Sequence, residues 1–413
     1  MKLTVPTPLD IEATVIELAW MLLGAAVLGM LAWRIRVPYA VVLVVGGLLV
    51  EESRLVALPQ LEPRVLLFVF LPPLLFDAAF RIDEHELRVA ARSVLFLAVP
   101  GTIATAAIVG AVLVLTLHLP LATALLFGSI VAATDPVAVV GVFRHMDTPT
   151  RLAVIAEAES LINDGVAITL YTATIGLATA GSVDVFGALA LFARQVVGGV
   201  VVGAVMGVAF SRLSAVIDDH MIEMMLSTAL AYGSYVAAQS LETSGALACV
   251  AAGLIHGSYG REVGMSERTR HRLDDLWEYF GFVVNALVFL LVGFTANLAS
   301  LVAAAGPVLV SIAVVFAARV VVVVAPSILL RLTQHLRLSR RLQVATSGAE
   351  LAVLIWGGLR GALTITLALA LPPDFPARQL LVAMAFGVVL FSLLVQGITL
   401  SLVVQRAGLA AAK

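Results

Sequence analysis

The sequence predicts an all-α integral membrane protein with about thirteen transmembrane helices. Of its 413 residues, 61% are hydrophobic and only 13% are charged, and the mean hydropathy of +1.07 lies outside the range of soluble domains. The apolar residues form long runs, and about 20 such residues cross a bilayer as a helix. A net charge of −2 gives no indication of a nucleic-acid partner. The single Cys249 excludes a disulfide framework.

Successive apolar runs define the predicted spans in chain order. The first follows Asp10 with no basic region before it, so we predict a membrane helix and not a cleaved signal peptide. The second and the ninth are short, which indicates either tilted helices or span boundaries that lie elsewhere. The predicted spans are 11–33, 37–50, 65–80, 90–117, 119–143, 152–180, 185–211, 221–240, 243–257, 276–298, 301–332, 348–371 and 379–404.

The basic residues set the predicted orientation. With the N-terminus outside, 18 of the 25 Lys and Arg residues fall on the inner side, 4 fall outside and 3 lie within spans. This asymmetry follows the positive-inside rule from end to end. It predicts a multi-pass protein of the cell (inner) membrane, surrounded by lipid, with a cytoplasmic C-terminus. The longest polar connection, about 258–275, is expected to be a cytoplasmic loop, and we expect no cytosolic regulatory domain.

Two spans contain sequences that interrupt a helix. The run ATDP at 133–136 lies in the fifth span, where Pro136 removes an amide donor and frees the carbonyl of Ala132. The run GGLRG at 357–361 lies in the twelfth span. An offset of seven spans reverses the direction of a helix in the membrane, as in an inverted repeat. Interrupted helices at corresponding positions of inverted halves indicate the binding site of a transporter.

Carboxylates inside these apolar spans are the strongest indication of function. Three acids, Asp135, Glu159 and Asp164, lie close together, and at bilayer depth they would cost about 8–10 kcal/mol unless they face water, an ion or a partner. Helical spacing places Ser160 on the face of Asp164, and Asn163 on the adjoining stripe. A carboxylate, an amide oxygen and a hydroxyl suit a hard monovalent cation or a proton. Cation and proton would then compete for Asp164, which is coupled exchange.

Two arginines within spans need anionic partners. Arg319 lies in the eleventh span and Arg360 in the interrupted twelfth, both far from the span ends. A buried pair with Glu159 would neutralise charge and fix the geometry of the core, whereas the alternative is an arginine that reaches an interface. We favour pairing, which makes Glu159 structural and leaves Asp164 free to titrate.

Two further acids are secondary candidates. Asp77 closes the third span near its cytoplasmic end, where it is either an ordinary helix-end acid or part of the ion site. Glu157 shares the face of Asp164 seven residues earlier, and could attract cations into an inner funnel.

Five motifs follow one another along the chain: RVPY at 36–39, LPPLLFD at 71–77, ATDP at 133–136, ESLINDG at 159–165 and WGGLRG at 356–361. In this order they resemble the NhaP-like sodium/proton antiporters, which are related to the animal sodium/hydrogen exchangers. The resemblance covers essentially the whole chain.

The resemblance implies an inverted-repeat fold with two crossed interrupted helices and a homodimer. It implies a moving core subdomain (about 90–180 and 301–404) and an interface subdomain (about 11–80 and 221–298). Asp164 would carry the proton or cation, and no cofactor is implied. Asp135, Thr134 and Ser160 would line the site. Glu159 and Arg319 would form an ion pair in the core. Arg360 would lie near the second break.

Position 77 is often Glu in relatives, where it reaches the ion. The shorter Asp77 makes direct coordination the weakest part of the predicted site. Relatives with the adjacent pair Asn163–Asp164 tend to exchange one cation for one proton. With a single titrating carboxylate, the cation-loaded site and the protonated site carry the same charge. We therefore predict electroneutral sodium/proton exchange.

The sequence is also compatible with other functions. A potassium- or lithium-preferring antiporter on the same fold is the nearest, since selectivity depends on site size. An intramembrane aspartyl protease would need Asp135 and Asp164 to share one water, and the neighbouring Arg and Asn residues argue against it. A purely structural membrane protein does not explain the cost of the buried charges.

Overall fold

The computed structural model describes residues 11–35, 37–53, 66–146, 148, 150–180, 185–217, 219–332 and 347–409, and within these ranges the regular structure is helical. Several basic residues used to predict orientation, and Arg36 of the second-span motif, lie outside the described residues. In chain order the helices are α1 (Ile11–Ile35), α2 (Tyr39–Ser53), α4 (Leu71–Arg81), α5 (Glu84–Phe96), α6 (Thr102–Leu117), α7 (Leu121–Ile130), α8 (Val137–His145), α9 (Thr150–Ala180), α10 (Val185–Ser214), α11 (His220–Ser240), α12 (Gly245–Ile255), α13 (Arg261–Val263), α14 (Glu267–Thr295), α15 (Leu298–Ala303), α16 (Ala305–Leu332), α17 (Gly348–Trp356), α18 (Ala362–Leu369), α19 (Arg378–Phe391) and α20 (Ile398–Arg406).

Each predicted span coincides with a helix or with successive helices, which confirms the all-α fold class. Several of the longer runs contain a π-helical turn, such as Leu97–Gly101 between α5 and α6, and Ser392–Gly397 between α19 and α20. Seven continuous runs among the described residues are long and apolar enough to cross a membrane. The total of thirteen crossings stays a prediction.

The main boundary difference lies around α14. Residues 258–275, expected to form a polar loop, are mostly helical, because a π-helical turn prolongs α12 to α13 and α14 begins at Glu267. The Ser266 hydroxyl caps α14 by accepting a hydrogen bond from the amide of Thr269. The polar first turns of α14 therefore belong to a helix, although hydropathy alone ends the span at about residue 276.

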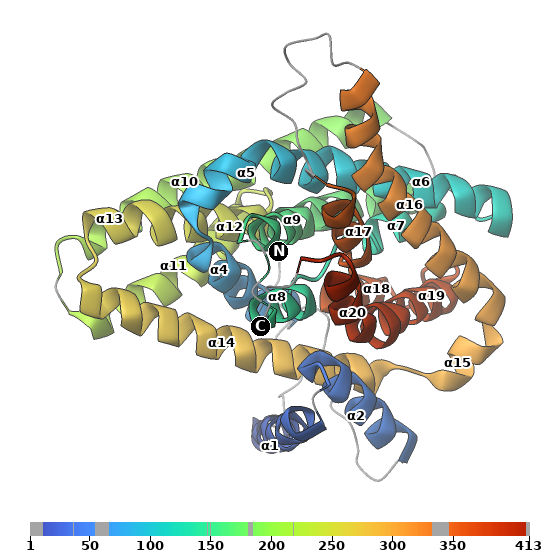
Figure 1. The fold of residues 1–413 in the computed structure, drawn as a ribbon, viewed down its shortest axis with the longest axis horizontal. Helices are drawn as coiled ribbons and strands as arrows, with labels where there is room; N and C mark the ends of the chain where they lie inside the picture. Colours follow the sequence, from blue (N-terminus) through green and yellow to red (C-terminus); the bar gives the residue numbers. More distant parts are fainter. Residues whose placement is uncertain are drawn as a thin grey trace.

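Two interrupted helices meet at the centre of the molecule, as predicted. The first is α7 and α8, separated by residues 131–136, and the second is α17 and α18, separated by residues 357–361. The amide of Asp135 donates a 2.8 Å hydrogen bond to the carbonyl of Leu359, which joins the two breaks. In Figure 1 these four short helices lie inside a frame of longer ones, with α14 along one side and α5 and α10 along the other.

Close packing against α2 and α4 determines where α14 lies relative to the interrupted helices. Gly47 of α2 and Gly293 of α14 face each other, and a Cβ at Gly47 would lie 2.9 Å from the Gly293 Cα. The glycine pair allows the two backbones to approach closely, as small residues do between membrane helices. This contact, together with the packing of α14 on α4, places the middle of α14 against the interrupted helices.

Candidate functional site

A cavity of about 690 Å³ lies between the interrupted helices, α4, α9 and α14. Its walls are largely apolar, with residues such as Leu74, Leu161 and Leu363. The polar part is strongly acidic and includes a single arginine, Arg81, among the described residues. The carboxylates that line it are Asp77, Asp135, Glu157, Asp164, Asp275 and Glu278. An acidic, mostly apolar-walled cavity raises the local concentration of cations.

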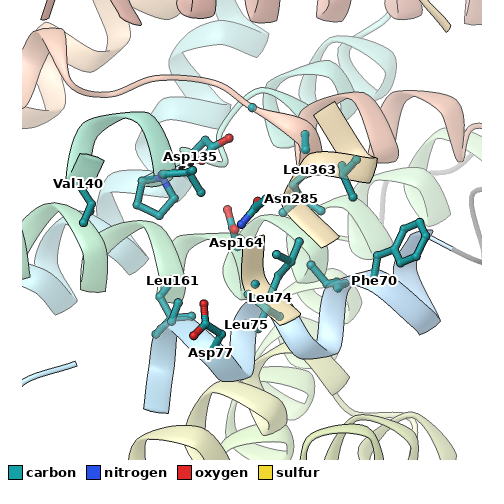
Figure 2. Close-up of a pocket in the computed structure, with 18 of the residues that line it drawn as sticks. Phe70, Leu74, Leu75, Asp77, Asp135, Val140, Leu161, Asp164, Asn285 and Leu363 are labelled. Carbon is teal, nitrogen blue, oxygen red and sulfur yellow. Dashed lines mark hydrogen bonds between the residues drawn. The ribbon is translucent and has the colours of Figure 1, made fainter. Parts of the chain in front are cut away.

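Asp164 occupies the middle of the 31-residue helix α9. Its Oδ1 atom is buried and has no hydrogen-bond partner among the described residues. Figure 2 shows its carboxylate directed into the cavity beside the side chain of Asn285 from α14. A buried carboxylate oxygen without a partner is costly, so a proton or a cation at this atom would relieve the cost.

Asp135 lies in the same cavity, but its carboxylate is engaged by backbone groups. Oδ1 accepts a 2.9 Å hydrogen bond from the amide of Val137 at the start of α8. The amide of Ala362 at the start of α18 also acts electrostatically on this carboxylate. The other carboxylate oxygen, Oδ2, lies against Gly361, and a Cβ atom at Gly361 would overlap it. One carboxylate therefore meets the N-terminal ends of two half-helices, where negative charge is stabilised.

Replacing Gly361 with Ala should reduce transport strongly. The new methyl group would occupy the position of the Asp135 carboxylate, and either Asp135 or the start of α18 has to move. The matched control is Gly141→Ala on the same cavity wall, where a Cβ meets nothing within 4 Å. Initial rates of proton movement at equal amounts of folded protein check this expectation. Equal rates for both variants would contradict it.

Thr134 joins the first break to α9. Its hydroxyl lies 2.8 Å from the hydroxyl of Ser160 and accepts a 2.6 Å hydrogen bond from the Asn163 amide nitrogen. The Thr134 amide donates to Asn163 Oδ1 at 3.2 Å. Thr134 lines the large cavity, whereas Ser160 and Asn163 do not. In the described structure Ser160 and Asn163 form hydrogen bonds with Thr134, and their part in an ion site stays a prediction.

Asn163→Ala should destabilise the junction between the two helices. It leaves the amide and hydroxyl of Thr134 without these partners in a buried setting, at a cost of about 1–3 kcal/mol. We expect a lower melting temperature in detergent and a lower transport rate. Thermal unfolding followed by intrinsic fluorescence measures the first, with Asn285→Ala as the control on the cavity wall. A melting temperature equal to that of the unmodified protein would show that the junction contributes nothing.

Glu159 and Arg319 form an ion pair in the core. The pair is bidentate: Arg319 Nη1 contacts Glu159 Oε1, and Nη2 donates to Oε2 at 3.1 Å. Arg319 also donates to the carbonyl of Leu354 at 3.2 and 3.0 Å. Glu159 is 2% exposed and Arg319 is 7% exposed. The pair ties α9 to α16 and to the helix before the second break.

Arg360 has a different environment from Arg319. It is 1% exposed, and its Nη1 donates a long 3.4 Å hydrogen bond to the carbonyl of Gly358. Its Nε atom has no partner in the described part of the chain. The ion pairs within 4 Å in that part do not include Arg360, so the structure places Glu159 with Arg319. Arg360 lies at the second break, as the resemblance implied.

Asp77 lines the cavity and forms an ion pair with Arg81, which the sequence analysis did not predict. Its carboxylate contacts Arg81 one helical turn later, at 2.7 Å from Nε to Oδ1 and 3.0 Å from Nη2 to Oδ2. Figure 2 shows Asp77 on the wall opposite the interrupted helices. Sequence reasoning also missed Asp275, Glu278 and Asn285 of α14. Asn285 could have been found, since it is a lone amide within an apolar run.

Membrane helices that surround two interrupted helices, with an acidic cavity at the interruption, define an ion-transporter class of protein. The chain belongs to the sodium/hydrogen exchanger family. The sequence model of this family, described as "Sodium/hydrogen exchanger, transmembrane", matches residues 21–406.

Individual relatives agree with this assignment. The chain is 35% identical over 393 residues to the Na(+)/H(+) antiporter NhaH of Halobacillus aidingensis, covering 92% of this chain and 94% of that protein. It is 35% identical over 356 residues to the Na(+)/H(+) antiporter NhaP of Pseudomonas aeruginosa, covering 83% and 81%. The structure of the sodium proton antiporter MjNhaP1 from Methanocaldococcus jannaschii at pH 8 matches with a TM-score of 0.80 at 18% identity, over 97% of this chain and 99% of that one. This last likeness shows the fold.

Proposed function

We propose that this protein exchanges sodium ions for protons, one for one, with Asp164 as the carrier of either ion. The observation that carries the proposal is the buried, unpartnered Oδ1 of Asp164 on the wall of the acidic cavity. The two other acids of the predicted ion site already have partners, since a backbone amide donates to Asp135 and Arg81 donates to Asp77. The relatives named as Na(+)/H(+) antiporters support sodium as the cation.

Competition for one carboxylate accounts for the coupling. Asp164 is neutralised either by a proton or by a cation, and the loaded site has the same net charge in both cases. The ionised empty site leaves a buried charge without a partner, which disfavours movement of the empty carrier. Thr134 and Asp135 complete the proposed oxygen site, with Ser160 and Asn163 holding Thr134. Because both loaded states carry the same charge across the membrane in opposite directions, a complete exchange cycle moves no net charge and is electroneutral.

Alternating access requires one group of helices to move against another. We assign the moving core to about 90–180 and 301–404, which contains both breaks and the Glu159–Arg319 pair. The interface part, about 11–80 and 221–298, contributes Asp77 and Asn285 to the opposite cavity wall. Secondary transporters move in this way around a site at the repeat interface.

The predicted topology places the cavity mouth at the cytoplasm. Glu157, Asp275 and Glu278 lie toward the cytoplasmic ends of α9 and α14 on that topology, so they form an acidic entrance. We propose a cell-membrane location with the N-terminus outside and the C-terminus inside, in support of sodium and pH homeostasis. Exposed apolar side chains such as Trp33 and Phe186 suit a lipid surface. A homodimer is proposed from the family resemblance.

Proton movement in proteoliposomes tests the proposal. Purified protein is reconstituted with a pH gradient and a fluorescent pH probe, and sodium, lithium or potassium is added at several pH values. Sodium pulses should dissipate the gradient, at a rate that does not depend on an imposed membrane potential. Activity with potassium or lithium alone would assign the same fold and site to another cation. No proton movement with any of these cations would overturn antiport.

A further inference from the structure

The pairing of Asp77 with Arg81 changes what the cavity presents to a cation. The Asp77 side chain is 9% exposed and the Arg81 side chain is 22% exposed, and both line the cavity. The 3.0 Å contact is aligned as a hydrogen bond, whereas the 2.7 Å contact is a close charge contact. The guanidinium thus donates one hydrogen bond to Oδ2 and stands in close charge contact with Oδ1, which has no hydrogen-bond partner among the described residues.

Helix α14 fixes this pair in position. Gly281 leaves the space that the Asp77 carboxylate fills, since a Cβ there would lie 3.0 Å from Asp77 Cγ. One turn earlier on α14, Glu278 lies 3.6 Å from Arg81 Nη1 and is 72% exposed. Arg81 therefore has a buried anion on one side and a solvated anion on the other. Its head group is held at the cavity wall and does not extend into open solvent.

Without Arg81, the cavity would contain a nearly buried carboxylate without a basic partner at Asp77, in addition to Asp135 and Asp164. Such a group attracts a cation or a proton, because an unpaired buried charge is unfavourable. A second site of this kind would bind a second ion or compete with Asp164 for the first. The pairing removes that possibility while keeping an acid at this position.

We propose that Arg81 is an intrinsic counter-ion that neutralises Asp77 and keeps it from acting as a further cation-binding carboxylate beside the site of Asp164 and Asp135. Arg81 thereby sets the apparent sodium affinity of the cytoplasmic entrance. Asp77 acts through Arg81 on the electrostatic potential of the cavity and does not ligate the ion. The inference rests on the proposed sodium/proton exchange at Asp164.

A double-mutant cycle tests the proposal in everted vesicles, which expose the cytoplasmic face to added sodium. Arg81→Gln leaves Asp77 unpaired, so the apparent KM for sodium should fall about three- to tenfold, the effect of one charge at cavity distances. Asp77→Asn leaves Arg81 with the solvated Glu278 alone and should raise the KM by a similar factor. The double variant Asp77→Asn/Arg81→Gln carries neither charge and should return to near the wild-type KM.

The outcomes separate this proposal from direct coordination by Asp77. Loss of transport in Asp77→Asn and equally in the double variant would assign Asp77 as a ligand and overturn the proposal. An unchanged KM in Arg81→Gln would also overturn it. The double variant has no unpaired charge, so it gives a decisive result even where a single variant does not fold. A wild-type protein that moves no protons on a sodium pulse would instead refute the proposed function.

The chain offers a matched control for the loss of one arginine. Arg88 pairs with Glu84 at the same four-residue spacing on α5, but its side chain is 77% exposed and it does not line the cavity. Arg88→Gln removes the same charge from the solvated surface, where salt screens it. Its sodium KM should equal that of the wild type. A fall as large as in Arg81→Gln would show that net charge, and not the cavity pair, sets the affinity.

Discussion

Asp164→Asn should reduce sodium-dependent proton movement to the level of protein-free liposomes. The substitution keeps the shape of the side chain but removes the group that takes up a proton or a cation. Oδ1 of Asp164 is buried without a hydrogen-bond partner, so the change also removes an unfavourable buried charge. We therefore expect a variant that folds at least as well as the wild type and does not transport. Proteoliposome flux at matched protein content measures the first property, and thermal unfolding the second.

Sodium binding gives an independent readout of the same variant. A ligand that binds the folded state alone raises its stability as the ligand concentration exceeds the dissociation constant. The wild type should therefore melt at a higher temperature with added sodium than with choline at equal ionic strength. Asp164→Asn should lose this difference. Asp275→Asn, at an exposed position on the same cavity, serves as the control and should keep both the sodium shift and most of the transport. Transport at wild-type rates by Asp164→Asn would exclude it as the carrier.

The fold and the principal residues of the site could be predicted because buried charges and helix breaks are costly in a membrane. Asp135, Glu159 and Asp164 are costly at bilayer depth, which marks them as functional or paired residues. Pro136 interrupts a regular helix. These costs are local, so the sequence displays them directly. The breaks in α7–α8 and α17–α18 indeed meet in space, through the Asp135 amide and the Leu359 carbonyl.

The partners of these residues could not be predicted from spacing. Helical periodicity placed Ser160 and Asn163 near Asp164, but the packing of Thr134 against α9 turns both of them to Thr134. The choice between Arg319 and Arg360 as the partner of Glu159 depends on how α16 lies against α9, which is a tertiary property. The acidic residues of α14 were missed for a different reason. The polar first turns of that helix resemble a loop when hydropathy alone sets the boundary.

Removing Arg319 alone should destabilise the protein severely. Glu159 is 2% exposed, and its bidentate partner in the described structure is Arg319. Breaking such a pair leaves an uncompensated buried charge, which costs about 3–5 kcal/mol. Arg319→Met should therefore yield little folded protein, or a much lower melting temperature in size-exclusion and thermal-unfolding experiments. The exposed pair Arg194–Glu242 provides the control, since Arg194→Met should leave the melting temperature unchanged.

The double variant Glu159→Gln/Arg319→Met separates the loss of the pair from the presence of an unpaired charge. A neutral replacement of a buried ion pair is often close to neutral in stability, so the double variant should recover much of the folded protein lost in Arg319→Met. Arg319 also donates to the Leu354 carbonyl at the end of the helix before the second break, and the double variant loses that tie. We therefore expect recovered folding with reduced transport, because the break that presents Gly361 to Asp135 is no longer held. Equal instability of the single and double variants would show that the Leu354 contacts, and not charge neutralisation, are what Arg319 contributes.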